Sequence, residues 1–162
     1  INQTNATIYA LDSQPYYCHN TDTNCIMQMI RFQFLRGEAM VSFEHFTIED
    51  GIPIYLQIAR HIKQGVVARG IQDGDEMPSR RMLSALLGVN PNTVQKAYRL
   101  LEEEGIIESR AGAISYVTLT ETKIEQVRKE LLENDTQSFV NAMQKMGVSK
   151  GEALSLIERL WK

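Results

Sequence analysis

The stretch that decides the fold spans residues 77–98 and reads MPSRRMLSALLGVNPNTVQKAY. It predicts two short helices joined by a tight turn. In the first helix, residues 79–87, the apolar side chains recur at the i, i+3, i+4 spacing of a helix that buries one face. Gly88 follows, where a chain leaving a helix can adopt positive φ without a Cβ clash. Asn90 can cap the second helix, and Pro91 at its first position gives up an N–H that has no partner there.

The second helix has two different faces. One face is apolar and is expected to pack inward, and it consists of Val94, Ala97, Tyr98 and Leu101. The other face carries amide, hydroxyl and basic side chains, namely Asn92, Thr93, Gln95, Lys96 and Arg99. Residues 78–101 contain four basic residues and no Asp or Glu. Because such side chains hydrogen-bond base edges and phosphates, the pattern predicts a helix-turn-helix whose second helix enters the major groove. An ordinary helical hairpin with a solvated polar face is the alternative.

The residues after the second helix predict a small hairpin. Gly105 is suited to end the helix, and residues 106–110 and 114–118 are expected to form two strands around a turn at 111–113. A helix-turn-helix followed by such a hairpin is a winged helix. Arg110 and Gly112 are expected at the tip of the wing, near the DNA backbone or the minor groove.

Residues 53–118 resemble the GntR family of bacterial transcription regulators. The shared motifs are a Pro-Ser-x-Arg start at 78–81, a Leu-Gly-Val turn at 87–89, a Thr-Val pair at 93–94, Leu-x-x-Glu-Gly-Ile-Ile at 101–107 and Arg-x-Gly at 110–112. The run 90–98 resembles the YtrA-like subfamily in particular. Many members of the family carry Arg where Pro91 stands, so no base contact is expected from that position.

This resemblance implies a winged helix-turn-helix with a short two-helix tail used for dimerisation. It also implies a repressor of a neighbouring operon, often one that encodes an ABC transporter. The residues expected to contact DNA are Ser79, Arg80, Arg81, Asn90, Asn92, Thr93, Gln95, Lys96, Arg99, Arg110 and Gly112. Arg80, Arg81 and Lys96 are expected mainly to contact phosphate. Asn92, Thr93 and Gln95 are expected to read bases, since Asn and Gln suit adenine.

The first helix of the domain is expected at residues 54–69. Its buried stripe is predicted to consist of Tyr55, Ile58, Ala59, Ile62 and Val66. Residues 70–76 form a turn-rich link, which the family resemblance assigns to a loop and a short strand before the helix-turn-helix.

Residues 119–162 predict two further helices. The long one is expected to bend at 134–136 and to end at Gly147, and the last one begins with a capping box from Ser149 to Glu152. No other part of the chain is evidently free to cover their apolar stripes, so we expect a symmetric homodimer. The residues expected at the interface are Leu131, Phe139, Val140, Met143, Leu154, Ile157, Leu160 and Trp161. The alternative is that these helices fold back on their own winged helix in a monomer.

A two-fold dimer predicts a palindromic operator in double-stranded DNA, with half-sites about 34–36 Å apart or a multiple of that distance. A tail of about 40 residues leaves no room within one subunit for a small-molecule pocket of ~300–1,000 Å³. An effector site, where one exists, is therefore expected at the dimer interface.

The chain of 162 residues allows one domain and a small appendage. We expect an N-terminal segment at 1–39, the winged helix at 40–118 and the dimerisation segment at 119–162. Segment 1–39 lacks a clear period and holds both cysteines, Cys18 and Cys25, expected to be incidental thiols; a disulfide or part of a metal site is the alternative. Arg36-Gly37-Glu38 back-translates into purine-rich codons before Met40, as in a ribosome-binding site. The native protein is therefore expected to begin at Met40.

Other classes of protein fit the sequence poorly. The three histidines fall at 19, 45 and 61, without the spacing of a catalytic set or a metal site, and no phosphate-binding loop is present. We therefore expect no enzyme activity, no cofactor and no metal. No apolar run reaches the ~18–20 residues of a membrane span, and a cytoplasmic protein is expected. A winged helix that contacts another protein is the alternative function. The fold class predicted is mainly α with a small β-wing.

Overall fold

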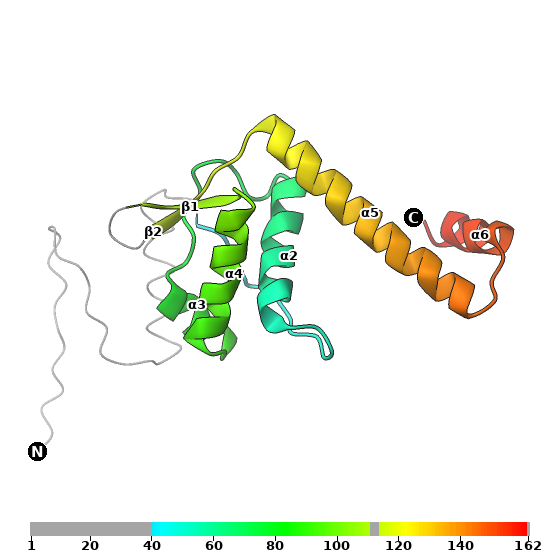
Figure 1. Cartoon of the computed structure of the whole chain (residues 1–162), viewed down its shortest axis with the longest axis horizontal. Helices are drawn as coiled ribbons and strands as arrows, with labels where there is room; N and C mark the ends of the chain where they lie inside the picture. Colours follow the sequence, from blue (N-terminus) through cyan, green and yellow to red (C-terminus); the bar gives the residue numbers. More distant parts are fainter. Residues whose placement is uncertain (1–39, 111–113, 162) are drawn as a thin grey trace, which may run out of the picture.

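The computed structural model describes residues 40–110 and 114–161 (Figure 1). The N-terminal segment with Cys18 and Cys25, and the wing residue Gly112, lie outside the described residues. The elements in chain order are α2 (Ile54–Val67), α3 (Arg80–Leu87), α4 (Pro91–Glu103), β1 (Ile107–Arg110), β2 (Ile114–Val117), α5 (Glu121–Lys145) and α6 (Lys150–Leu160). The fold is mainly α with a small wing, as predicted.

The helix-turn-helix forms through the local signals that its sequence carries. The Ser79 hydroxyl accepts a hydrogen bond from the Met82 N–H at 3.2 Å and so caps α3. Gly88 ends α3 in the left-handed region with φ of 65°. The Asn90 side chain then accepts from the Asn92 N–H at 2.8 Å, and Pro91 occupies the first turn of α4. The caps satisfy backbone N–H groups that a helix start leaves free.

The wing is an antiparallel pair in which Ile107 lies opposite Val117. The chain before α3 is joined to it, since Glu76 bridges Tyr116 on one side and Met40 on the other. The Met77 N–H also donates to the Ser115 carbonyl at 2.8 Å. These bonds confirm the short extended segment expected before the helix-turn-helix, and they fix the wing relative to α3.

The core lies where α2, α4 and the wing meet. All four residues predicted to face inward on α4 are buried. Buried apolar side chains also come from the lead-in segment, α2, α3, the wing and the start of α5, among them Val41, Phe43, Ile58, Ile62, Val66, Leu83, Ile106, Val117, Ile124 and Val127. The buried Tyr98 hydroxyl donates to the Pro78 carbonyl at 2.6 Å, which pins α4 to the chain entering α3. Burial raises the pKa of Tyr98, and the charge of Arg80 opposes that shift.

The C-terminal helices lead away from this core (Figure 1). On α5 only Ile124 and Val127 are buried, and α6 has no buried residue. Within the described residues, α6 therefore does not fold back into the winged-helix core. Leu131, expected at a dimer interface, packs partly against the core of its own domain, and its contact with a second copy stays a prediction. Residues 134–136, where a bend was expected, belong to one continuous helix that runs straight in Figure 1.

The ends of both helices agree with the sequence. Gly147 has φ of 73° just after α5, and the Ser149 side chain accepts from the Glu152 N–H at 3.3 Å. Among the helices that the structure describes, none combines the length and the apolar character that crossing a membrane requires.

Candidate nucleic-acid interface

The outer face of α4 presents the polar side chains that its sequence predicts. Asn92, Gln95 and Lys96 are exposed, and Thr93 is half-buried beside them. The opposite face of the same helix is fully used by the core. A rigid, well-packed helix therefore holds these amides toward solvent, which is the arrangement that reading base edges in a groove requires.

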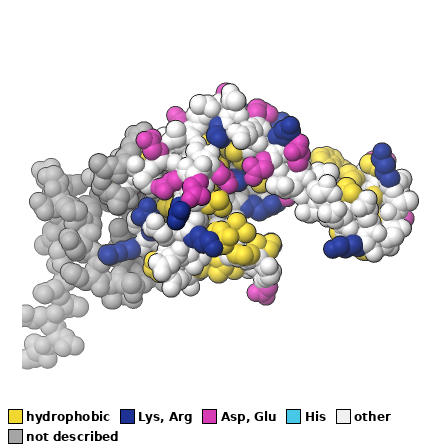
Figure 2. Space-filling model, viewed as in Figure 1, with side chains coloured by type: hydrophobic (Ala, Val, Ile, Leu, Met, Phe, Trp, Pro, Cys, Tyr) yellow, Lys and Arg dark blue, Asp and Glu magenta, His cyan; other side chains and the backbone are white. Residues whose placement is uncertain are grey.

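Basic side chains border this face. Figure 2 shows dark-blue Lys and Arg side chains over the part of the surface formed by α3 and α4. Arg81 is exposed, whereas Arg80 is half-buried. The Nε atom of Arg80 is buried without a hydrogen-bond partner among the described residues. Leaving such a donor unsatisfied costs about 1–3 kcal/mol.

Two of the expected contact residues serve first as helix caps. The side-chain oxygens of Ser79 and Asn90 accept hydrogen bonds at the starts of α3 and α4. The Ser79 hydroxyl hydrogen and the Asn90 amide hydrogens stay available as donors. A helix N-terminus attracts anions, so each capped end is a favourable place for a phosphate.

A contact that sequence reasoning missed joins α2 to α4. The Lys96 ammonium lies 3.9 Å from the centre of the Tyr55 ring, a cation–π contact. Tyr55, expected in the buried stripe of α2, is only half-buried. It lies at the first turn of α2, and its partner is 41 positions away in sequence, so helical periodicity could not indicate it. The ring restricts where the Lys96 charge can go.

Arg99 and Arg110 are the remaining two predicted arginines. The Arg99 guanidinium pairs with Glu103 one turn further along α4, at 2.8 Å, and both side chains are well exposed. Its charge is therefore already balanced on the protein. Arg110 ends β1, and the tip of the wing at 111–113 lies outside the described residues.

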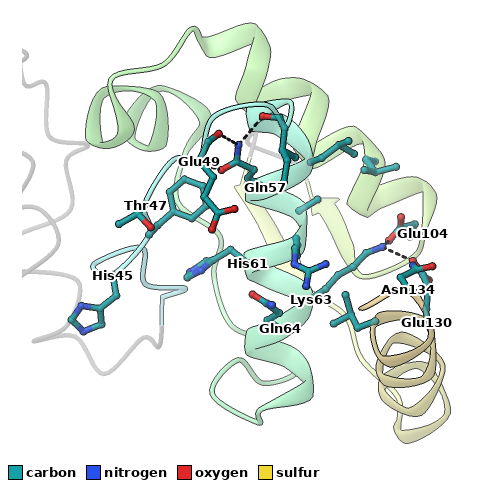
Figure 3. Close-up of a pocket in the computed structure, with 17 residues that line it drawn as sticks. His45, Thr47, Glu49, Gln57, His61, Lys63, Gln64, Glu104, Glu130 and Asn134 are labelled. Carbon is teal, nitrogen blue, oxygen red and sulfur yellow. Dashed lines mark hydrogen bonds and ion pairs between the residues drawn. The ribbon is translucent and has the colours of Figure 1, made fainter. Parts of the chain in front are cut away.

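A groove runs between the lead-in segment, α2 and α5, and Figure 3 shows the side chains that line it. Its volume is about 910 Å³, and its walls include His45, Glu49, Leu56, Lys63 and Asn134. It is a groove open to solvent and not a deep pocket, so the expectation that one subunit has no room for a deep small-molecule pocket stays a prediction. Most of its lining comes from the lead-in segment and α2.

The cation–π contact leads to a first prediction. Tyr55→Leu should weaken DNA binding by about two- to five-fold, the value of an exposed cation–π contact of ~0.5–1 kcal/mol, because Lys96 loses its preferred position. Tyr55→Phe keeps the ring and should bind almost as the parent does. Fluorescence anisotropy measures both. If Tyr55→Leu weakens binding equally in a Lys96→Ala background, the two residues do not act together.

Comparison with known proteins places this surface in a family. Residues 54–117, from α2 to the end of the wing, match the family described as bacterial regulatory proteins, gntR family. The uncharacterized transcriptional regulator YhcF of Bacillus subtilis (strain 168) is 34% identical over 106 residues, which cover 65% of this chain and 88% of YhcF. The transcriptional repressor YtrA of the same organism is 40% identical over 85 residues, which cover 49% of this chain and 65% of YtrA.

Solved structures give the same result. A GntR family transcriptional regulator from Listeria monocytogenes is 34% identical and superposes with a TM-score of 0.63, covering 70% of this chain and 99% of the other. A transcriptional regulator from Oenococcus oeni is 26% identical with a TM-score of 0.54, covering 74% of this chain and all of the other. These similar proteins are named as regulators of transcription, in agreement with the prediction that the chain is not an enzyme.

Proposed function

Because the chain belongs to the GntR family of bacterial regulatory proteins, we propose that it is a transcriptional repressor that binds an inverted-repeat operator as a homodimer. Regulation of transcription through a DNA-binding winged helix is the property of the family. The oligomeric state, the palindromic operator and the repressor role are the further steps of the proposal.

The observation that carries the proposal is the exposed face of α4. Asn92 and Gln95 project from a helix whose other side is buried, with Arg80 and Arg81 beside them. No acidic side chain occurs between residues 78 and 101 to repel phosphate. An apolar exposed face would instead favour a winged helix that contacts protein.

Dimerisation is proposed from the apolar surface of the tail. Phe139 and Val140 on α5 are about one-third exposed, at 36% and 37%. On α6 the exposed fraction is 49% for Leu154 and 70% for Leu160, and it is 81% for Trp161, which directly follows the helix. Large apolar side chains gathered in this way mark a protein–protein contact, and a second copy of the chain supplies the same surface. We therefore propose residues 40–118 as the DNA-binding unit and 119–162 as the dimerisation unit.

The regulatory part of the proposal comes from the relatives. YtrA is named as a repressor, and we propose the same direction of control for this chain, acting in the cytoplasm on a neighbouring operon that includes transporter genes. A small-molecule effector has two candidate places in this proposal. One is the dimer interface, and the other is the groove beside α2.

Selection of bound sequences from a random duplex library tests the proposal. The full chain should enrich an inverted repeat whose half-site centres are about one helical turn (~34–36 Å) or a multiple of it apart. Enrichment of a single unrepeated site would contradict dimeric recognition. Recovery of random sequence at low salt would contradict specific binding and favour the protein-contact function.

A second prediction concerns Arg81, which is exposed beside the reading helix. Arg81→Ala should weaken binding to all DNA similarly and should lower the slope of log K against log salt by about one, because one phosphate contact is lost. Arg99→Ala is the matched control. Because the charge of Arg99 is paired with Glu103, the slope of log K against log salt should change less than in Arg81→Ala. An unchanged slope for Arg81→Ala would remove this residue from the phosphate contacts.

A further inference from the structure

Three ion pairs attach α5 to α2 and to the turn that follows it. Two of the basic partners, Arg60 and Lys63, are on α2, the third, Arg69, lies just after its end, and the acidic partners are on α5. Arg60 and Asp135 lie 2.7 Å apart, Arg69 and Glu121 lie 2.6 Å apart, and Lys63 and Glu130 lie 3.1 Å apart. These contacts connect the winged helix to the helix that leads to the tail. They therefore fix the direction in which α5 leaves the DNA-binding unit.

Lys63 differs from the two arginines in burial and in the number of its partners. Its side chain is 9% exposed, compared with 45% for Arg60 and 53% for Arg69. Its ammonium also lies 2.6 Å from Glu104, the C-cap residue of α4 (Figure 3). One buried charge thus joins α2, the end of the reading helix and the tail helix.

The cluster keeps Lys63 charged. Burial lowers the pKa of Lys63, but hydrogen bonds and charge attraction from Glu104 and Glu130 outweigh it and hold the pKa above its ordinary value. Both carboxylates remain partly exposed, at 30% and 48%. Exposed ion pairs such as that of Arg60 contribute little to stability. A buried charge such as that of Lys63 has little contact with water, so its stabilisation depends strongly on its ion-pair partners.

The direction of α5 matters because the helix acts as a long lever. Its 25 residues extend about 38 Å at ~1.5 Å per residue. Its buried contacts, Ile124 and Val127, lie near its start. A tilt of about 10° at the start of the helix moves its far end by roughly 6–7 Å. One turn of DNA rises ~34–36 Å over ~10 base pairs, so this displacement equals the rise of about two base pairs. A small loosening at Lys63 is therefore enough to change the separation of two recognition helices.

We propose that Lys63 is a positioning residue that, through Glu104 and Glu130, sets the half-site spacing that the dimer accepts. This inference rests on the proposed function, since it requires a dimer that reads two half-sites. Lys63 acts through the helices it joins and does not itself contact DNA.

The test measures binding of the full chain to operators that differ only in spacing. The half-site selected from the random library is placed as an inverted repeat, and its spacing is changed one base pair at a time. The unsubstituted chain should show one narrow optimum. Lys63→Met, which keeps the length of the side chain and removes its charge, should reduce the preference for that optimum over its neighbours by about tenfold. Its affinity for a single half-site should be unchanged.

Two substitutions serve as controls. Arg60→Met removes an exposed ion pair from the same face of α2 and should keep the narrow optimum. Lys63→Arg keeps a charge between the two carboxylates and should restore most of the preference. Should Lys63→Met fail to fold, as judged by circular dichroism, Lys63→Met/Glu104→Gln/Glu130→Gln replaces it, because this variant leaves no unpaired charge.

The outcomes separate this inference from the proposed function. Equal weakening at every spacing and at the single half-site would show that Lys63 is only structural, and would overturn the inference. The inference would also be overturned if Lys63→Met and the triple variant Lys63→Met/Glu104→Gln/Glu130→Gln both kept the narrow optimum of the unsubstituted chain. If the unsubstituted chain shows no optimum and no preference for inverted repeats, the proposed dimeric recognition fails, and the role of Lys63 fails with it.

Discussion

Replacing Leu154 and Leu160 with Glu is expected to give a monomer whose affinity for the operator is lower by about 10²–10⁴-fold. Both side chains lie on α6 and are 49% and 70% exposed in the single chain. In a dimer, the second recognition helix binds at a high effective concentration once the first has bound. A monomer loses that advantage, although its single winged helix is unaltered.

Sedimentation and anisotropy measure this effect together. Ser155→Glu is the matched control, since it adds one charge to the same helix on an exposed position whose hydroxyl bonds only within the helix. The control should remain a dimer with normal operator affinity. A double variant that stays dimeric, or a parent chain that is monomeric at the concentrations where it binds DNA, would contradict the proposed interface.

The second large effect is expected from Asn92→Ala combined with Gln95→Ala. Each amide that pairs with a base contributes ~1–3 kcal/mol of discrimination, so their joint loss should weaken operator binding at least about 30-fold. Binding to random DNA should change little, because phosphate contacts supply most of it. The two side chains are exposed and outside the core, so the stability of the domain should be preserved.

Competition anisotropy with operator and random duplexes distinguishes side chains that read bases from side chains that contact only the DNA backbone. Gln126→Ala, which removes an exposed amide on α5, should leave both affinities unchanged. A loss of equal size on operator and random DNA would show that Asn92 and Gln95 contact the backbone and do not read bases.

Local signals account for what the sequence predicted well. The caps at Ser79 and Asn90, the left-handed Gly88 and the two faces of α4 all depend on residues within one or two helical turns. The pairing of β1 with β2 also follows from a short turn between alternating strands. The fold and the polar face of the reading helix could therefore be predicted without any long-range information.

Contacts between distant segments could not be predicted in this way. Lys63 and Glu130 are 67 positions apart, and neither has a neighbour in sequence that indicates the other. The same holds for Lys96 and Tyr55. Periodicity shows that Leu131 is on an apolar stripe, but it could not show that the core of its own domain covers part of this side chain. The groove beside α2 also required knowing where α5 packs.

The most direct test of the central claim is the affinity of the full chain for the DNA upstream of its own operon, compared with a random duplex of equal length. Anisotropy is followed as salt is raised. We expect binding that is at least about 10³-fold tighter on the upstream DNA, with a steep dependence on salt on both duplexes. Equal affinity for both duplexes would contradict sequence-specific regulation at this site, and no binding at low salt would contradict DNA binding itself.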